Sequence, residues 1–438
     1  MSPTVPARRR GDARLGRDLR LFHAYRFLST SYLFLPVMMK FFHERGLDYT
    51  QIALLNTVYA VTAVVFEVPT GALADLFGRC RAMMLGALLM ALGCVVNYHG
   101  HDFWTFALGE SLLALGMTLT SGADSAYLYD LLRSARRESE YRRHEGSATA
   151  AKMIGAAMAL AVGGFIGRRD PGLTYAFTAG VCGAAALVAF MMREPAFSRD
   201  DESAFFRGIV HAGKRVLQSR PLGFAVLFSV LLFSLLRPGI FLHPSYLENA
   251  GFSALHGYPG LVMAGISLIG AVGAYRISTV RRFFGEGRLV WVLPLVLAAT
   301  YFGLGAVVTM GGVVLLILQS LVNGVFSPFS KELINREVSD SGKRATVLSV
   351  ESMARRLVFG AFFPVCGVLM DRYQLSAGFW VCGFAAALVA GGFVVAGWMR
   401  RRSGLHDFEG EQTPTPLPDA MPVDRRASLP QSSPQSPS

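Results

Sequence analysis

The chain is short of charge, short of cysteine and without the common motifs of soluble enzymes. Only 16% of its 438 residues are charged, whereas soluble domains carry about 25%. The cysteine number is odd and no two cysteines form a C-x-x-C pair, which argues against both a disulfide framework and a zinc site. We therefore expect no metal ion and interpret the cysteines as small buried hydrophobic residues, Cys80, Cys94, Cys182, Cys366 and Cys382.

Sequence motifs of soluble catalysis and nucleotide binding are also missing. The chain contains no G-x-S-x-G and no H-E-x-x-H. Gly208-x4-Gly213-Lys214 is similar to a phosphate loop, but Arg215 stands where a magnesium-binding Ser or Thr is needed. We predict a protein that is not an enzyme, has no cofactor, and takes energy from an ion gradient or from its substrate's own gradient.

What the chain does have is a series of apolar blocks, each about as long as a ~30 Å hydrocarbon layer requires. Helices and closed barrels are the only backbones that satisfy their own hydrogen bonds in lipid, and barrel strands need only about 10 residues. The sequence therefore predicts an all-α membrane protein with twelve transmembrane helices. They are expected near 21–43, 49–74, 82–100, 103–132, 145–167, 172–192, 221–248, 254–278, 289–308, 311–334, 345–370 and 376–399.

The distribution of Lys and Arg predicts the topology. With both termini inside, 32 of the 42 cations fall in cytoplasmic segments and five in external loops, as the positive-inside rule requires. The net charge of +12 is explained by these loops, so no nucleic-acid partner is expected. Six arginines in residues 1–20 precede a long run that contains Arg26, which predicts a retained first span rather than a cleaved signal. We expect a multi-pass protein of the plasma (bacterial inner) membrane, with both termini cytoplasmic.

The longest central loop predicts two halves of six helices. Glu44-Arg-Gly-Leu47 is similar to Asn249-Ala-Gly-Phe252, and Ser147–Met153 to Val347–Met353, at nearly equal offsets. The expected domains are a basic tail, an N-terminal half, a linker with an amphipathic helix on the inner leaflet, a C-terminal half and a disordered Pro/Ser-rich tail. Their bounds are 1–20, 21–192, 193–220, 221–402 and 403–438.

A charged, glycine-punctuated turn carries the most specific motif, Gly71-Ala-Leu-Ala-Asp-Leu-Phe-Gly-Arg-Cys-Arg81. It resembles the loop between helices 2 and 3 of the major facilitator superfamily, as found in bacterial drug and metabolite exporters. The family motif has cations where this chain has Leu76 and Cys80, but the remaining gating positions are kept, Gly71, Asp75, Gly78, Arg79 and Arg81.

The resemblance implies the two-half fold of the superfamily, lined by helices 1, 4, 7 and 10. It also implies that Asp75 binds the start of helix 11 and stabilises the outward-facing state; the alternative is a solvated loop carboxylate. Gly155, Gly163 and Gly164 resemble the helix 5 motif of drug–proton antiporters, without its proline. We interpret them as positions of close helix packing.

Ionisable residues inside the predicted spans are the candidate functional groups, because each costs about 2.5–3.5 kcal/mol at mid-helix. Glu110 is the first candidate proton carrier, because a desolvated carboxyl can exchange a proton as access alternates. Glu67 is the second, with a gating ion pair as its alternative, and Asp124 is the third. For Asp124 a bridge to Lys152 is the simpler expectation.

The candidate substrate contacts are mostly cations. Arg237 lies beside Pro238 without an in-helix partner, so it could bind substrate or form an interhelical ion pair. Glu351 and Arg355 are four residues apart and are expected to form a structural ion pair on one face of the helix. Arg356 then lies about 100° away around the helix, apart from this pair. The full set of substrate-binding candidates is Arg26, Arg237, Arg356, Tyr32 and Asn323.

These features predict a secondary active transporter that works by alternating access, with proton-coupled export of small organic molecules as the first hypothesis. An importer or exchanger of an organic anion is the second, because five cations lie within the spans. A non-transporting sensor or scaffold is the third, and deletion of 403–438 would separate it from a transporter. The expected partners are a small-molecule substrate and the lipid bilayer, and the expected state is a monomer.

Overall fold

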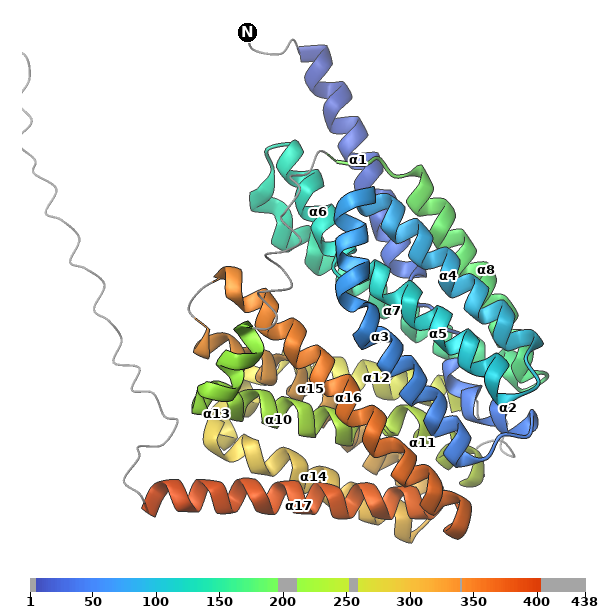
Figure 1. Ribbon diagram of the computed structural model, residues 1–438, viewed down its shortest axis with the longest axis vertical. Coiled ribbons are helices and arrows are strands. Elements are labelled where there is room, and N and C mark those ends of the chain that lie inside the picture. The colour runs from blue at the N-terminus through green and yellow to red at the C-terminus, as the bar shows by residue number, and fades with distance from the viewer. Residues whose placement is uncertain (1–4, 196–210, 252–258, 339–340, 403–438) are drawn as a thin grey trace, which may run out of the picture.

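The computed structural model describes residues 5–195, 211–251, 259–338 and 341–402, and these ranges fold into helices and turns (Figure 1). Within them ten helical segments are long and apolar enough to cross a membrane, or eleven if the bent pair of α12 and α13 is one span. With the broken segment at 21–43, they occupy the positions of the twelve predicted helices. The prediction of an all-α membrane protein is confirmed.

The first half of the chain forms one bundle, with two short 3₁₀ turns (η1 and η2) between its helices. Its elements are α1 (Val5–Leu28), η1 (Leu35–Val37), α2 (Met38–Glu44), α3 (Tyr49–Phe77), α4 (Arg79–His99), α5 (Phe103–Thr120), α6 (Ala123–Ser134), η2 (Glu138–Glu140), α7 (Tyr141–Gly167) and α8 (Pro171–Met191).

The second half forms the other bundle and also contains a 3₁₀ turn. Its elements are α10 (Arg220–Leu236), α11 (Gly239–Asn249), α12 (Pro259–Tyr275), α13 (Ile277–Phe284), α14 (Glu286–Ala306), η3 (Met310–Gly312), α15 (Val313–Glu337), α16 (Ser341–Tyr373) and α17 (Leu375–Arg402).

The first predicted span is not one continuous helix, which corrects the prediction for 21–43. The helix α1 ends at Leu28, and the chain turns before η1 and α2. A hydroxyl-rich segment follows Leu28, and the hydroxyl of Ser31 donates to the carbonyl of Phe27 at 2.7 Å. Such side chains compete with the helical backbone for hydrogen bonds, and Pro36 then begins a new turn.

Two other spans are broken where the sequence allows it. The span expected at 103–132 divides between α5 and α6 at Gly122, whose φ of +84° is accessible to glycine at little cost. The span expected at 221–248 divides between α10 and α11 at Pro238, which has no N–H to continue the helix. The second break places Arg237 at the end of α10.

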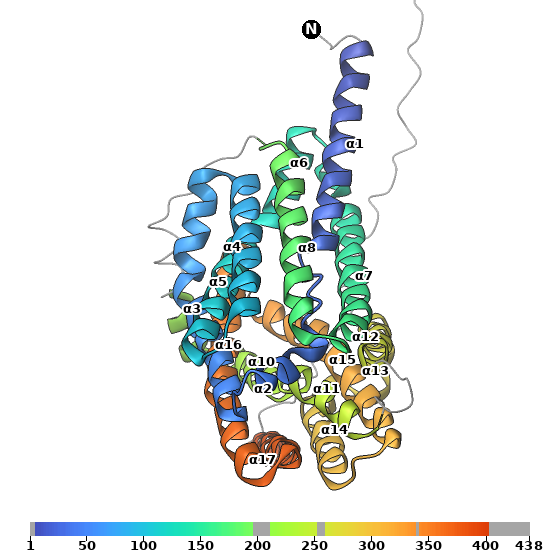
Figure 2. The same ribbon diagram turned by 90° about the vertical axis from the view of Figure 1, so that its right-hand side faces the viewer.

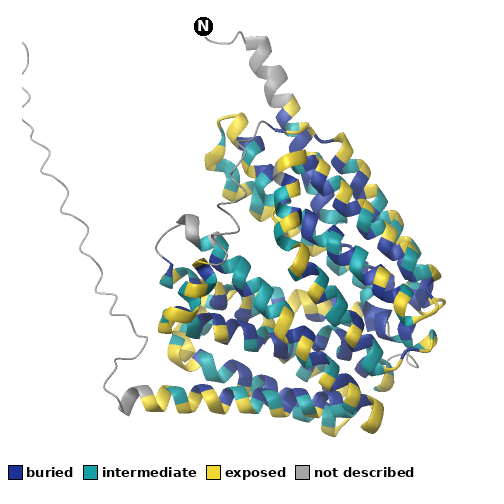
Figure 3. Cartoon of the chain, viewed as in Figure 1, coloured by how far each residue is buried: buried dark blue, intermediate teal, exposed yellow. Residues whose placement is uncertain are grey.

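The two bundles meet along α3 and α16 and along α7 and α12, and they diverge away from these contacts (Figures 1 and 2). We call the end where they meet the closed side, and the end with the N-terminus and the α3–α4 turn the open side. Buried residues concentrate inside each bundle, while apolar side chains such as Leu388 of α17 stay exposed on the outer surface (Figure 3). An exposed apolar perimeter is what a bilayer would cover.

The segments 196–210 and 403–438 lie outside the described residues. The predicted amphipathic linker helix falls largely on the first of these, and the predicted disordered tail on the second.

Candidate functional site

A carboxylate of one bundle binds a helix N-terminus of the other on the closed side. Asp371, near the end of α16, accepts hydrogen bonds from the backbone N–H groups of Tyr49 and Thr50 at 2.8 and 2.9 Å. It also accepts from the Thr50 hydroxyl at 2.5 Å. An anion at a helix N-terminus is favourable because the first N–H groups have no partner within the helix. This contact ties α3 to α16, and sequence reasoning missed it.

Close packing of glycines completes the closed side. A Cβ on Gly164 of α7 would lie 2.7 Å from the Cα of Gly260 in α12, so the two backbones touch. In the contact of α3 with α16, the hydroxyl of Thr57 donates to the carbonyl of Gly360 at 2.6 Å. Small residues allow this approach, as the helix 5 glycines predicted.

The glycine-punctuated turn joins α3 to α4 on the open side. Gly78 has a φ of +103° and lies against the carboxylate of Glu194. That carboxylate accepts from the backbone N–H groups of Arg79 at 2.5 Å and Cys80 at 2.9 Å, so it caps α4. The Arg79 side chain pairs with Asp130 of α6 at 3.9 Å. Sequence reasoning missed Glu194, because it lies more than 100 residues from the turn.

The other gating positions are less engaged. Arg81 is exposed, and a Cβ on Gly71 would meet nothing within 4 Å. Asp75 lies within α3, but its side chain is outside the described part of the structure, as are those of residues 341–343 at the start of α16. The predicted contact of Asp75 with helix 11 stays a prediction.

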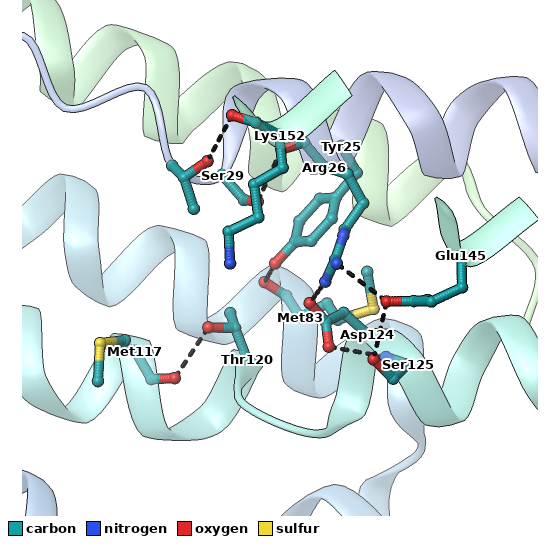
Figure 4. A network of polar contacts seen from close by, with 11 residues as sticks. Tyr25, Arg26, Ser29, Met83, Met117, Thr120, Asp124, Ser125, Glu145 and Lys152 are labelled. Carbon is teal, nitrogen blue, oxygen red and sulfur yellow. Dashed lines mark hydrogen bonds and ion pairs between the residues drawn. The ribbon is translucent and has the colours of Figure 1, made fainter. Parts of the chain in front are cut away.

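Arg26 binds two carboxylates inside the first bundle (Figure 4). Its guanidinium pairs with Asp124 of α6 and, at 3.2 Å, with Glu145 of α7. The expected bridge between Asp124 and Lys152 is therefore wrong: Asp124 is held by Arg26, whose side chain reaches it from α1. The Lys152 ammonium points away from this cluster, and only its backbone carbonyl makes a drawn contact (Figure 4).

A second charged cluster lies inside the other bundle. Arg355 pairs with Glu351 one turn earlier on α16, as the spacing predicts. The buried hydroxyl of Ser229 in α10 donates to Glu351 and accepts from Arg355 at 2.6 Å. The guanidinium also lies 5.3 Å from the ring centres of Phe233 and Phe326. The guanidinium of Arg355 is therefore engaged by these contacts, which hold α16 against α10.

Arg237 and Arg356 differ from Arg355, because they form no such contacts among the described residues. Within the described ranges, neither guanidinium has a hydrogen bond or an ion pair, and one Arg356 nitrogen is buried without a partner. Their charges act on each other and on the hydroxyl of Tyr59, which belongs to α3 of the opposite bundle. Two half-buried cations from the second bundle therefore face the first bundle without a counter-ion bound to them.

Two carboxyls of the first bundle, one buried and one half-buried, are the remaining acidic candidates. Glu110 of α5 is 8% exposed and accepts a hydrogen bond from the side-chain amide of Asn97 at 3.1 Å. Glu67 of α3 has one buried oxygen without a partner in the described part of the chain, and it lies within the electrostatic reach of Arg356. Glu110 faces the interior of its bundle, while Glu67 faces the opposite bundle.

The remaining two candidates have weaker positions. Tyr32 is half-buried in the turn after α1, with its ring 5.8 Å from that of Phe34. Asn323 is exposed on α15. Neither side chain makes a hydrogen bond among the described residues, so both roles stay predictions.

Two helical bundles that meet at one end, with two arginines unpaired among the described residues, are typical of a membrane transporter. The sequence profile of the Major Facilitator Superfamily matches residues 24–357, and the chain belongs to this family. Curated relatives share short stretches. An uncharacterised transporter of Buchnera aphidicola is 28% identical over 107 residues, which are 24% of this chain and 27% of that protein. The inner membrane transport protein YajR of Escherichia coli is 29% identical over 107 residues, 24% and 23% of the two chains.

Both alignments therefore span only about a quarter of the relatives' own length. Solved structures match over nearly the whole chain. The nucleoside transporter NupG superposes with a TM-score of 0.72 at 16% identity, covering 87% of this chain and 98% of that one. A peptide transporter of the POT type in complex with sulfate superposes with a TM-score of 0.68 at 14% identity, covering 89% and 95%. At these identities the likeness concerns the fold alone.

Proposed function

We propose that this chain is a proton-coupled secondary active transporter that exports small organic molecules carrying an acidic group. The observation that carries the proposal is the pair of guanidinium groups of Arg237 and Arg356, which have no partner among the described residues and act electrostatically on Tyr59 of the opposite bundle. An arginine in a low-dielectric interior needs an anionic partner. A carboxylate or phosphate of the substrate supplies it, and a guanidinium binds either group with two parallel hydrogen bonds.

The positions of the two cations suit alternating access. Both belong to the second bundle, and the tyrosine they act on belongs to the first. A substrate held between these cations and Tyr59 contacts both bundles, so its binding energy can differ between the state open on one side and the state open on the other. Only such a difference can shift the equilibrium between the two states.

Glu110 is the proposed proton carrier. It is a buried carboxyl with an amide as its hydrogen-bond partner and no cation bound to it among the described residues. Burial disfavours the charged form of a carboxyl, so such a group takes up and releases protons as its exposure to water changes. Glu67 is the proposed gating partner of Arg356, and the open side is the proposed cytoplasmic side.

The cation assignment is tested with ligand pairs that differ only in charge. Purified protein is screened by thermal shift against small organic acids and the neutral amide of each. We expect acids to stabilise the protein more than their amides. Arg237→Gln and Arg356→Gln each remove a guanidinium and its charge-assisted hydrogen bonds to the acid, so each should weaken acid binding about tenfold or more. Arg237→Lys should retain part of the preference.

The matched control is Arg372→Gln, which removes an exposed arginine at the far end of α16. If Arg372→Gln loses as much acid binding as the two site variants, or if both site variants bind acids as the parent does, Arg237 and Arg356 are not the substrate contacts. Everted vesicles test the direction: accumulation that collapses when the proton gradient is dissipated supports export.

Proton coupling is tested separately with Glu110→Gln. We expect this variant to lose gradient-driven accumulation while retaining substrate exchange across the membrane. Glu138→Gln, an exposed carboxyl at the start of the turn before α7, is the control and should behave as the parent. Normal accumulation by Glu110→Gln would exclude Glu110 as the carrier.

Import or exchange of an organic anion is the second candidate, favoured by the same two cations. It predicts accumulation in right-side-out vesicles, or exchange that does not depend on a proton gradient. The acid–amide comparison supports both candidates, and the vesicle orientation distinguishes them.

A further inference from the structure

The short helix α13 lies between two spans of the second bundle on the open side, next to α14 and α15 (Figure 1). It follows α12 after a bend of 63°, so it does not continue the direction of that span. Ile277 and Val280 face the hydrophobic core of the bundle. Gly285, with a φ of +76°, then turns the chain into α14.

A cluster of ion pairs connects α13 to α14 and α15. Arg281 pairs with Glu286 of α14 and, at 2.5 Å, with Glu332 of α15. Arg336 of α15 binds the second oxygen of Glu286 at 3.0 Å. Because Arg281 spans both neighbours, α13 has a defined orientation and a defined outer face.

Exposed aromatic rings and arginines lie on α13 and at the adjoining ends of α12 and α14. Tyr275 is 83% exposed and Phe283 is 80% exposed, although each is a large ring that a water-soluble surface would cover. Arg276, Arg282 and Arg288 are exposed beside them. Exposed aromatic rings next to arginines are typical of segments lying at a bilayer interface, with the rings toward the acyl chains and the cations toward the phosphates.

The charge of this surface is not balanced by the protein. The nearby carboxylates of Glu286 and Glu332 are already bound by Arg281 and Arg336. Within the described residues, the three exposed arginines have no acidic partner, which leaves three unpaired cations in the same short segment as two exposed rings.

We propose that the exposed surface around α13 binds anionic phospholipid in the leaflet on the open side. It is formed by Arg282 and Phe283 of α13, by Tyr275 and Arg276 at the α12–α13 bend, and by Arg288 of α14. The headgroup phosphate meets the arginines, and the rings enter the region of the upper acyl chains. This surface is separate from the transport site and does not depend on which substrate is carried.

The test uses a tryptophan reporter in place of an exposed ring. Phe283→Trp is reconstituted in vesicles of zwitterionic lipid that contain a fraction of brominated lipid, either anionic or zwitterionic. Bromine quenches tryptophan on contact, so the ratio of the two quenching constants measures the preference at α13, with the parent protein subtracted. We expect about a tenfold preference for the anionic lipid, because each interfacial cation attracts it.

Two sets of variants in the same background decide the role of the arginines. Replacing Arg276, Arg282 and Arg288 by Gln should reduce the preference to near unity, and replacing them by Lys should keep it. Removing Arg142 and Arg143, exposed arginines at the start of α7, should change nothing. A second reporter, Leu388→Trp on the exposed face of α17, should be quenched equally by both lipids.

The proposal is overturned by any of three results: no quenching at position 283, equal quenching by both lipids there, or a preference that survives the Gln substitutions. A preference of equal size at position 388 would also overturn it, because the attraction would then belong to the whole protein.

Discussion

Replacing Asp371 by asparagine should open the closed side of the protein. The carboxylate accepts three hydrogen bonds from the N-terminus of α3, at 2.8, 2.9 and 2.5 Å. In Asp371→Asn one acceptor oxygen becomes an NH₂ donor that faces N–H groups, and the charge that favours the helix N-terminus is lost. These contacts hold one bundle against the other, so their loss acts on the equilibrium between the two access states.

The size of the effect follows from the geometry. A charge near an exposed helix N-terminus contributes about 0.3–1 kcal/mol, and a lost hydrogen bond about 0.5–1.5 kcal/mol. Asp371 is exposed, so we take the low part of both ranges. A total of about 1 kcal/mol corresponds to a shift of about fivefold in the ratio of the two states.

The assay is a distance distribution between spin labels on opposite bundles, for example at Arg81 and Arg282 on the open side, after replacement of the five native cysteines. We expect the population with a short distance to grow in Asp371→Asn, since opening one side closes the other. Thr50→Val should produce a smaller change in the same direction.

Asp102→Asn is the matched control. Asp102 accepts from the N–H groups of Trp104 and Thr105 at 2.9 and 3.0 Å and from the Thr105 hydroxyl at 2.6 Å, which is the same set of donors. All of these lie within one bundle. If Asp371→Asn leaves the distances as unchanged as Asp102→Asn does, the carboxylate does not hold the bundles together.

Three further predictions concern packing and buried polar groups. Gly164→Val should force α7 from α12 and reduce the closed-side contact in the same distance assay, whereas Gly180→Val, with nothing within 4 Å, should not. Burial raises the pKa of the Asp18 carboxyl, which precedes the first predicted span, against the opposing charges of nearby arginines. The folded state therefore holds this proton more tightly, and stability falls as the pH rises through that pKa. Asp18→Asn should raise the unfolding temperature at neutral pH and leave it unchanged in acid; a lower temperature at neutral pH contradicts this. Ser229→Ala should lower the free energy of unfolding by about 1–3 kcal/mol, because it removes the hydroxyl that bonds the buried pair of Glu351 and Arg355. Ser234→Ala, which removes a bond only within its own helix, should cost less.

Local patterns determined the features that depend on near neighbours in the chain. Apolar blocks of span length predicted the helices because a backbone in lipid must bond to itself. The Glu351–Arg355 pair followed from a spacing of one helical turn. The helix breaks were harder to predict: the glycine and proline at Gly122 and Pro238 permit a break, but a span can also keep such residues.

The tertiary structure alone decided which charges neutralise one another. Asp124 could have bound Lys152, yet Arg26 reaches it because α1 packs beside α6 and α7. The same packing joins Asp371 to the start of α3 across more than 300 residues. Such pairings depend on how the helices are rotated and stacked, which the energy of packing the whole bundle sets and which no local spacing encodes. Sequence alone therefore determined that this chain crosses a membrane and belongs among transporters of two bundles. The packing of those bundles decided that Arg237 and Arg356 have no ion-pair partner among the described residues.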